Sequence, residues 1–570
     1  MKSSHVSRIK LLSLFVVLFA SFLVARLYVV QIVQGSDFSD RADRQYVRPG
    51  YSLYDRGSIF MEDKEGRLVS AATLKTGFTV AIRPDNIEEP ADTYNLLSSV
   101  IPLEEETFLS RAGKKGDPYE EIAVRVDPET AKRINNFNLS GVDTYKDRWR
   151  FYPGNALAAQ AVGFVAFDND TLTGTYGIER YYEDILTREE DSLYVNFFAE
   201  VFANLYKTIF CRSAASAGNI ITSIEPSVQL HLEGKLKEVY EKWDSNLTAG
   251  VIIDPMNGEI FALGVYPGFD LNNFQSEEDA RVFVNPLVEN IYEMGSIIKP
   301  LTMAAALDVD AVTPETTYYD HGFVDLDGYT ISNFDGKGRG RVNMQEVLSQ
   351  SLNTGVSFVV KQMGNDVFAS YVKAYGLGEE TGIDLPNESA GLVQNLDSPR
   401  DIEYATASFG QGIAMTPIST VRALSVLANG GVLVTPHVAK EIDYKSGLSK
   451  KVQFNDGKRV LKTETSEEIT RMLVKVVDEA LRGGTVKLPN YSIAAKTGTA
   501  QIAKVDERGY YDDRFLHSFF GYFPAYEPRF LIFLLNVEPK QVRYASETLT
   551  EPFIDSVKFL INYYEIPPDR

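Results

Sequence analysis

The most constraining feature of the chain is the stretch from Glu293 to Pro300, in which a serine and a lysine stand three residues apart. If this stretch is helical, Ser296 and Lys299 face the same side one turn apart, so the Lys299 amine can take the proton of the Ser296 hydroxyl. Pro300 suits the first turn of a helix, and Gly295 allows a tight turn into it. The sequence therefore predicts a serine nucleophile beside its base at the start of a helix.

Two further motifs distinguish this pair from chance copies. The spacing Ser-x-x-Lys also occurs at residues 7–10 and 370–373, so alone it is a weak signal. Downstream of Ser296 come, in order, Ser351-Leu352-Asn353 and Lys496-Thr497-Gly498-Thr499. Another Lys-Thr-Gly at residues 75–77 precedes Ser296 without partner motifs, which makes it a chance match. The ordered set predicts that three distant segments meet at one site.

Composition excludes several classes of function. A chain of 570 residues predicts two to four domains. A formal net charge of −21 argues against a nucleic-acid partner, because phosphate binding needs clustered Lys and Arg. Cys211 is the single cysteine, and the five histidines form no pair at helical metal-ligand spacing. We expect no intramolecular disulfide, no metal and no cofactor.

The N-terminus carries a membrane signal. Basic residues precede a mainly apolar run over residues 11–25 that contains no charged residue and continues past Arg26 to Val30. This length suffices for one transmembrane helix, predicted over residues 11–33. A cleaved signal peptide is the alternative, but no Ala-x-Ala site follows the run. The basic start places residues 1–10 in the cytoplasm and everything after about residue 34 outside the cytoplasmic (inner) membrane.

Residues 34–217 mix short alternating strands with Gly, Asp and Asn turns, which predicts an extended α+β module. Within it, residues 191–210 have helical periodicity and a wide aromatic face. That helix either packs on its own domain or binds a partner or membrane surface. The small residues 213–218 mark the boundary to a second domain over residues 218–570.

The second domain begins with an amphipathic helix over residues 227–243 and a hairpin of two apolar runs joined by an Asn-Gly turn. Strand-like runs follow late in the chain at residues 492–502, 516–523 and 529–537, and a last helix covers residues 551–564. A largely helical region lies between the two sets of strands. The pattern predicts an α+β fold with a five-stranded antiparallel sheet and an inserted all-α subdomain.

The ordered motifs at Ser296, Ser351 and Lys496 resemble the signature of the penicillin-recognising serine acyl-transferases. Over nearly its whole length the chain resembles a class B penicillin-binding protein, a monofunctional peptidoglycan D,D-transpeptidase with a pedestal (dimerisation) module and a transpeptidase domain. Residues 518–524 and the short C-terminus resemble the division-specific branch (penicillin-binding protein 3-like), and the elongation branch is the alternative. Further stretches that carry the resemblance are residues 26–28, 55–59, 177–179, 222–226, 408–412 and 416–417.

The resemblance implies a serine acyl-transfer mechanism. Ser296 attacks the carbonyl between the last two D-alanines of a stem peptide and forms an acyl-enzyme. Lys299 must be neutral to act as base, so we expect burial and the cation of Lys496 to depress its pKa. Ser351 passes the proton to the leaving amine, and Asn353 orients Lys299 and the substrate amide.

The remaining site residues are expected to bind the substrate. The backbone N–H groups of Ser296 and Thr499 form the oxyanion hole, at roughly 3 to 4 kcal/mol per donor. The hydroxyls of Thr497 and Thr499, with Lys496, suit the terminal carboxylate of the donor, and Gly498 permits close approach of the backbone. Gln411 either shapes the floor of the site or simply lies in a glycine-rich turn.

The resemblance also implies the reaction partners. An amine of a neighbouring stem peptide takes the acyl group and makes a cross-link, and β-lactams acylate Ser296. A D,D-carboxypeptidase or β-lactamase-like hydrolase with water as acceptor is one alternative, and a scaffold or β-lactam sensor is another. The pedestal module is expected to dock a polytopic glycan polymerase and division proteins. Whether the acceptor is diaminopimelate or lysine is left open by the sequence.

Overall fold

The computed structural model describes residue 19 and residues 54–168, 171–188, 217–454, 457–504, 507 and 509–570. Apart from residue 19, the predicted membrane anchor at residues 11–33 and the aromatic helix at residues 191–210 lie outside the described residues. Among the residues described, no helix is both long and apolar enough to cross a membrane.

The larger of two compact units contains the described residues within 55–75, 149–188 and 217–570. Its centre is a five-stranded sheet in the order β18-β19-β20-β8-β9, and every neighbouring pair is antiparallel. The strands are β8 (Leu247–Ile253), β9 (Ile260–Tyr266), β18 (Ala494–Ala503), β19 (Tyr510–Phe523) and β20 (Phe530–Val537). The prediction of a five-stranded antiparallel sheet is confirmed. Strand β18, which carries the Lys-Thr-Gly motif, is an edge strand.

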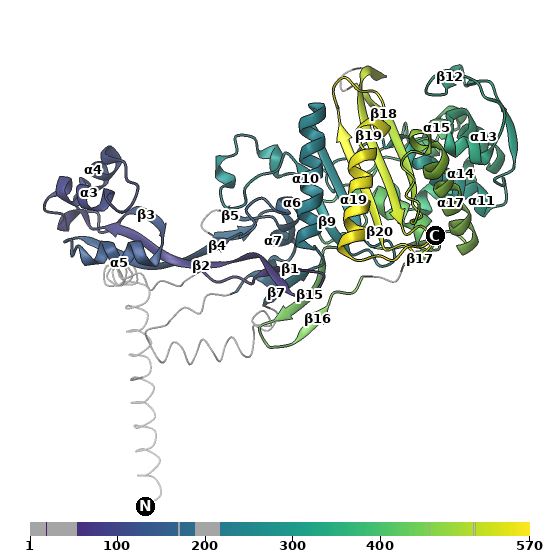
Figure 1. Ribbon diagram of the computed structural model, residues 1–570. Helices are drawn as coiled ribbons and strands as arrows, with labels where there is room; N and C mark the ends of the chain where they lie inside the picture. The colour runs from purple at the N-terminus through teal and green to yellow at the C-terminus, as the bar shows by residue number, and fades with distance from the viewer. Residues whose placement is uncertain are drawn as a thin grey trace, which may run out of the picture. The chain divides into compact units, whose positions relative to one another are not determined.

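Helices cover both faces of this sheet because its strands are apolar on both sides. On one face, α10 (Pro226–Trp243) and α19 (Thr550–Tyr563) bury Leu232 and Phe553 with Phe519 of the sheet. On the other face, α11 (Lys299–Asp308) and α17 (Thr463–Lys475) bury Met303 and Ile469 with Phe520. Figure 1 shows α10 and α19 lying along the sheet. Strand β18, which carries Lys496, and helix α11, which begins with Lys299, therefore belong to the same layered structure.

The predicted helical region between the strands is present, and it carries the second motif. Its helices are α12 (Met344–Ser349), α13 (Asn353–Met363), α14 (Asn365–Ala374), α15 (Asp401–Ala407) and α16 (Pro417–Ala428). Ahead of it, two small antiparallel pairs were not predicted, because each strand has only four residues. These are β10 (Thr317–Asp320) with β13 (Gly340–Asn343), and β11 (Phe323–Leu326) with β12 (Tyr329–Ser332).

The smaller unit contains, among described residues, 76–148. Its core residues, including Ile82, Leu97 and Phe108, come from strands and helices of this unit. Those elements are the second half of β2 (Leu68–Ile82), α3 (Pro90–Ser98), α4 (Glu105–Ala112), β3 (Glu120–Val126), α5 (Pro128–Asn136) and most of β4 (Val142–Phe151).

The two compact units alternate along the chain, and the predicted division into a pedestal module over residues 34–217 and a second domain over residues 218–570 stays a prediction. Residues 55–75 and 149–188, predicted in the pedestal module, pack in the larger unit. The physical reason is strand pairing: β1 (Ile59–Glu62) pairs in parallel with β7 (Gly218–Thr222), which in turn pairs with β15 (Ala439–Tyr444). A pairing between strands so far apart along the chain leaves no local signal in the sequence.

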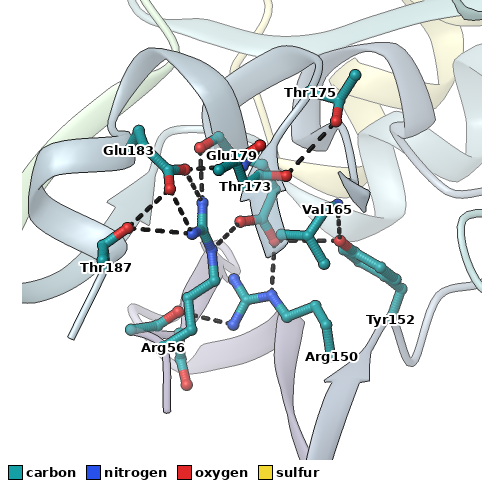
Figure 2. A network of polar contacts seen from close by, with 12 residues as sticks. Arg56, Arg150, Tyr152, Val165, Thr173, Thr175, Glu179, Glu183 and Thr187 are labelled. Atoms are coloured by element: carbon teal, nitrogen blue, oxygen red, sulfur yellow. Dashed lines mark hydrogen bonds and ion pairs between the residues drawn. The ribbon is translucent and has the colours of Figure 1, made fainter. Parts of the chain in front are cut away.

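A buried ion network holds these segments together (Figure 2). The Glu179 side chain is 0% exposed, and its carboxylate accepts from Arg56 Nε and Arg150 Nε, each at 2.6 Å. The Arg56 guanidinium also bonds Glu183 Oε2 at 2.6 Å, and Tyr152 donates its hydroxyl to Glu179 at 3.2 Å. Arg56, Arg150 and Glu179 lie in three separate stretches that look like isolated charged turns in the sequence. In the structure the two arginines meet at the Glu179 carboxylate.

Replacing Glu179 with glutamine is expected to destabilise the larger unit severely. The substitution leaves two guanidinium groups, each 2% exposed as side chains, without their shared counter-charge. Breaking one partner out of a buried ion pair costs about 3–5 kcal/mol in the free energy of unfolding. Thermal and denaturant unfolding of the variant would measure this loss. Arg67→Gln, which breaks an exposed ion pair to Asp63, is the control and should leave the melting temperature unchanged.

Candidate active site

The predicted serine turn is formed as a single turn of 3-10 helix, Gly295–Ile298, that leads directly into α11. Gly295 has a φ of +65°, a conformation that side chains rarely adopt, and a Cβ there would lie 2.9 Å from the Thr499 carbonyl oxygen. Pro300 occupies the first turn of α11, as predicted. The buried side chains of Ile297 and Ile298 anchor the turn and leave Ser296 half-buried.

Lys299 is fully buried and its amine contacts the second motif. The side chain is 0% exposed, and Nζ donates to the Ser351 carbonyl oxygen at 2.5 Å and to Ser351 Oγ at 3.1 Å. Burial, and next the positive charge of Lys496, hold the pKa of Lys299 well below its usual range. Within the described residues no hydrogen bond joins Lys299 to Ser296, so direct proton transfer between them stays a prediction.

Ser351 adopts an unusual backbone conformation that presents two oxygens to Lys299. Its φ is +55°, the left-handed region, which is costly for a residue other than glycine. The two bonds to Lys299 therefore depend on a turn that other parts of the fold must hold in place.

The sheet edge supplies the third motif. Lys496 on β18 is 4% exposed and donates to the Thr497 carbonyl oxygen at 2.9 Å. Burial lowers the pKa of Lys496 to about 7. Thr499 Oγ1 accepts a hydrogen bond from the Ala545 N–H at 3.0 Å. The positive charge of Lys496 is the second cause of the lowered pKa of Lys299, so the two amines lie close enough to interact electrostatically.

Gly498 brings the strand against the serine turn. A Cβ at this position would lie 2.3 Å from Ser518 Oγ, 2.7 Å from the Met294 carbonyl oxygen and 3.0 Å from the Ile297 nitrogen. Strand β18 and the serine turn are therefore in close contact at Gly498, and the substrate-binding role of Gly498 stays a prediction. Because β18 is an edge strand, alternate backbone N–H groups point away from β19. The oxyanion hole predicted from the N–H groups of Ser296 and Thr499 stays a prediction.

Asn353 and Gln411 are the two remaining predicted site residues. Asn353, the first residue of α13, donates its side-chain N–H to the Ser332 carbonyl oxygen at 2.9 Å, and its predicted role in orienting Lys299 stays a prediction. Gln411 lies between Gly410 and Gly412, and a Cβ on Gly410 would be 2.3 Å from the Gly295 carbonyl oxygen. The turn that carries Gln411 thus packs on the serine turn, while the role of its side chain stays a prediction.

Sequence reasoning missed Glu293, three residues before Ser296. Burial raises the pKa of Glu293, and its Oε1 accepts from the Gly412 N–H and from the Tyr510 hydroxyl, both at 3.0 Å. Glu293 thereby ties the serine turn to the glycine turn and to the start of β19. Its position beside the motif was visible in the sequence, but its partners lie more than one hundred residues away.

In the described part of the chain, no group of three or more His, Cys, Asp and Glu side chains is placed to hold a metal ion. The site instead combines a half-buried serine, two buried lysines, a second serine and an edge strand. These are the components of nucleophilic acyl transfer.

Comparison with known proteins agrees with this chemistry. Residues 248–557 match the penicillin binding protein transpeptidase domain, and residues 54–197 match the penicillin-binding protein dimerisation domain. The chain is 32% identical to stage V sporulation protein D of Bacillus subtilis, over 95% of this chain and 84% of that protein. It is 25% identical to the peptidoglycan D,D-transpeptidase FtsI of Buchnera aphidicola, over 97% of this chain and 94% of that protein.

The fold is also that of solved structures. Penicillin binding protein 3 of Mycobacterium tuberculosis in complex with aztreonam superposes with a TM-score of 0.68 at 21% identity. The match covers 91% of this chain and 98% of that one. At this identity the likeness concerns the fold alone.

Proposed function

The chain belongs to the class B penicillin-binding proteins and is a serine-type peptidoglycan D,D-transpeptidase, and we propose that it cross-links stem peptides through an acyl-enzyme on Ser296. The observation that carries this proposal is the buried Lys299 amine, bonded to both oxygens of Ser351 and depressed in pKa. A neutral amine in that position can accept the proton of a serine one turn away.

The reaction follows from these groups. Ser296 Oγ attacks the carbonyl carbon of the penultimate D-alanine, and its proton passes to Lys299 Nζ. The peptide C–N bond breaks, and Ser351 relays the proton to the departing amine of the terminal D-alanine. An amine of a second stem peptide then attacks the ester carbonyl, which forms the new amide and returns a proton to Ser296. Lys496, when charged, attracts the terminal carboxylate of the donor strand.

The oxyanion that forms at each step needs donors at a fixed place. The N–H groups of Ser296 and Thr499 belong to two segments that Gly498 allows into close contact. Donors fixed by the fold cost no reorganisation when the charge develops, and each contributes about 3 to 4 kcal/mol. The same geometry accounts for acylation by β-lactams, which resemble the D-alanyl-D-alanine end.

We further propose a single-pass anchor at residues 11–33 that places the active site outside the cytoplasmic membrane. The support is the sequence: an apolar run long enough for one span, preceded by basic residues.

The proposed biological context is septal cell-wall synthesis, with a polytopic glycan polymerase and division proteins as partners. A role in elongation is the alternative. A relative named as a stage V sporulation protein adds synthesis during sporulation as another candidate. Tracking a fluorescent fusion of the full chain to septum, lateral wall or forespore separates the three.

Release of D-alanine with and without an acceptor amine tests the reaction type. We expect a donor pentapeptide to give a cross-linked product when an acceptor is present, with little hydrolysis. The measurement is the ratio of cross-linked to hydrolysed peptide by mass spectrometry. Predominant hydrolysis at saturating acceptor would instead support a carboxypeptidase, and absence of both products with an intact fold would support a β-lactam-binding scaffold or sensor.

A further inference from the structure

Beside the second motif lies a buried polar cluster of Asp320, Asn333 and Thr354, here called the Asp320 cluster. The three side chains belong to residues that are 1%, 3% and 5% exposed, respectively. Asp320 Oδ1 accepts from the Gly322 N–H at 2.9 Å, from Asn333 Nδ2 at 3.1 Å and from the Thr354 hydroxyl at 2.8 Å. Asp320 Oδ2 accepts from Asn333 Nδ2 at 3.0 Å and from the Arg339 N–H at 2.9 Å. The carboxylate is therefore surrounded by donors on both oxygens.

The cluster is bonded to the start of the helix that follows Ser351. The residue at the N-cap position of α13 is Leu352, whose apolar side chain makes no capping bond. Asn333 Oδ1 takes that place from another segment, lying 3.3 Å from the Thr354 nitrogen and 3.1 Å from its hydroxyl. The carbonyl oxygen of the neighbouring residue, Ser332, accepts a hydrogen bond from Asn353 Nδ2 at 2.9 Å. Two consecutive residues of one segment thus hold the first two residues of α13.

What the cluster holds is the turn that presents Ser351 to Lys299. On its N-terminal side the turn is bonded to α12, through the Ser351 N–H to Leu348 at 3.2 Å and the Leu352 N–H to Val347 at 2.9 Å. On its C-terminal side the Asp320 cluster supplies the side-chain bonds. Ser351 itself is in the left-handed region at a φ of +55°, so its conformation needs support from both sides.

We propose that Asp320 and Thr354 are positioning residues for catalysis, which fix the Ser351–Asn353 turn so that both oxygens of Ser351 meet the Lys299 amine. This inference rests on the proposed roles of Ser351 and Lys299. A displacement of about 1 Å in a catalytic group can cost about 100-fold in rate. The cluster touches neither Ser296 nor Lys299 through any hydrogen bond among the described residues, so its effect on the reaction is indirect.

The pair Thr354→Val and Thr354→Ser tests the proposal in the full-length protein. Valine has nearly the shape of threonine but lacks the hydroxyl, whereas serine keeps the hydroxyl and lacks one methyl group. The acylation rate constant k2 and the binding constant K for a fluorescent penicillin are measured separately, per titrated active site. We expect Thr354→Val to lower k2 by about 10- to 100-fold with K nearly unchanged. Thr354→Ser should stay within about threefold of the wild type.

Asp384→Asn is the matched control for the loss of a buried network. Asp384 is 0% exposed, accepts from the Val438 and Ala439 N–H groups at 2.7 Å each, and receives the Tyr182 hydroxyl at 3.1 Å. It makes no contact with the Ser351 turn in the described structure. The control should lower the melting temperature without changing k2, whereas Thr354→Val should change k2 more than its melting temperature explains.

A purely structural role predicts a different result. If Thr354→Val has a reduced melting temperature but acylates with the wild-type k2, the positioning role is overturned. Should Thr354→Val fail to fold, Thr354→Ala also lacks the hydroxyl and introduces no bulk, and the same comparison applies to it. Acylation by penicillin needs no acceptor amine, so a failure of the cross-linking assay is distinguishable from a failure of this proposal.

Discussion

Replacing Ser296 with alanine abolishes covalent labelling by a fluorescent penicillin, while the fold is retained. The reason is chemical: the acyl-enzyme is an ester to Ser296 Oγ, and alanine has no atom that can form it. Ser296 is half-buried in a turn held by Ile297, Ile298 and Gly295, so loss of one oxygen should not disturb the packing. The measurement is fluorescence of the protein band after denaturing electrophoresis, with circular dichroism to confirm the fold.

The chain contains its own control for this experiment. Ser370 also stands three residues before a lysine, but it lies exposed on α14, where its hydroxyl donates to the Val367 carbonyl oxygen at 2.7 Å. Ser370→Ala should label like the wild type. Equal labelling of Ser296→Ala and the wild type would overturn the assignment of the nucleophile, and loss of labelling in Ser370→Ala would assign the nucleophile to the second Ser-x-x-Lys pair.

Much of the catalytic domain could be predicted because its signals are local. Apolar runs of strand length and an Asn-Gly turn indicated β8, β9 and the three late strands, and the structure has all five in one antiparallel sheet. The glycines at 295 and 498 were predicted to permit tight turning and close approach, and a Cβ at either would meet backbone within 3 Å. Constraints of this kind can be recognised in a sequence because only glycine, which has no Cβ, satisfies them.

The rest depends on contacts between residues far apart along the chain. Nothing near Lys299 indicates that its amine meets the carbonyl oxygen of Ser351, because that contact requires a left-handed residue 52 positions away. Nor does any local pattern show that Arg56 and Arg150 share the carboxylate of Glu179. The same holds for the Asp320 cluster, whose donors come from three short segments. Polar side chains in turns look solvated in a sequence, and only the tertiary fold reveals which are buried.

Lys299→Met should lower the second-order rate constant for acylation by about 10³-fold, because general-base catalysis by a positioned side chain contributes about 10² to 10⁴. Methionine has a similar length and suits a site that is 0% exposed, so the protein should remain folded. Lys373→Met removes the exposed lysine of the chance motif, which pairs with Asp397, and should acylate like the wild type. Stopped-flow or quenched labelling with a penicillin gives the rate constants.

The pH dependence of the acylation rate distinguishes the role of Lys299 from that of Lys496. Only the neutral Lys299 amine can accept a proton, so wild-type acylation should slow as the pH is lowered and Lys299 becomes protonated. Because the pKa of Lys299 is depressed, this fall in rate should occur at a pH well below the pKa of an ordinary lysine. Lys496 attracts a carboxylate only while charged, so with a pKa of about 7 it should give an alkaline fall near neutral pH in the free enzyme. The wild-type profile is then bell-shaped, and Lys299→Met should lose the acid limb while it keeps the alkaline one. An unaltered acid limb in Lys299→Met would assign the base to another residue, because the group that titrates there would still be present.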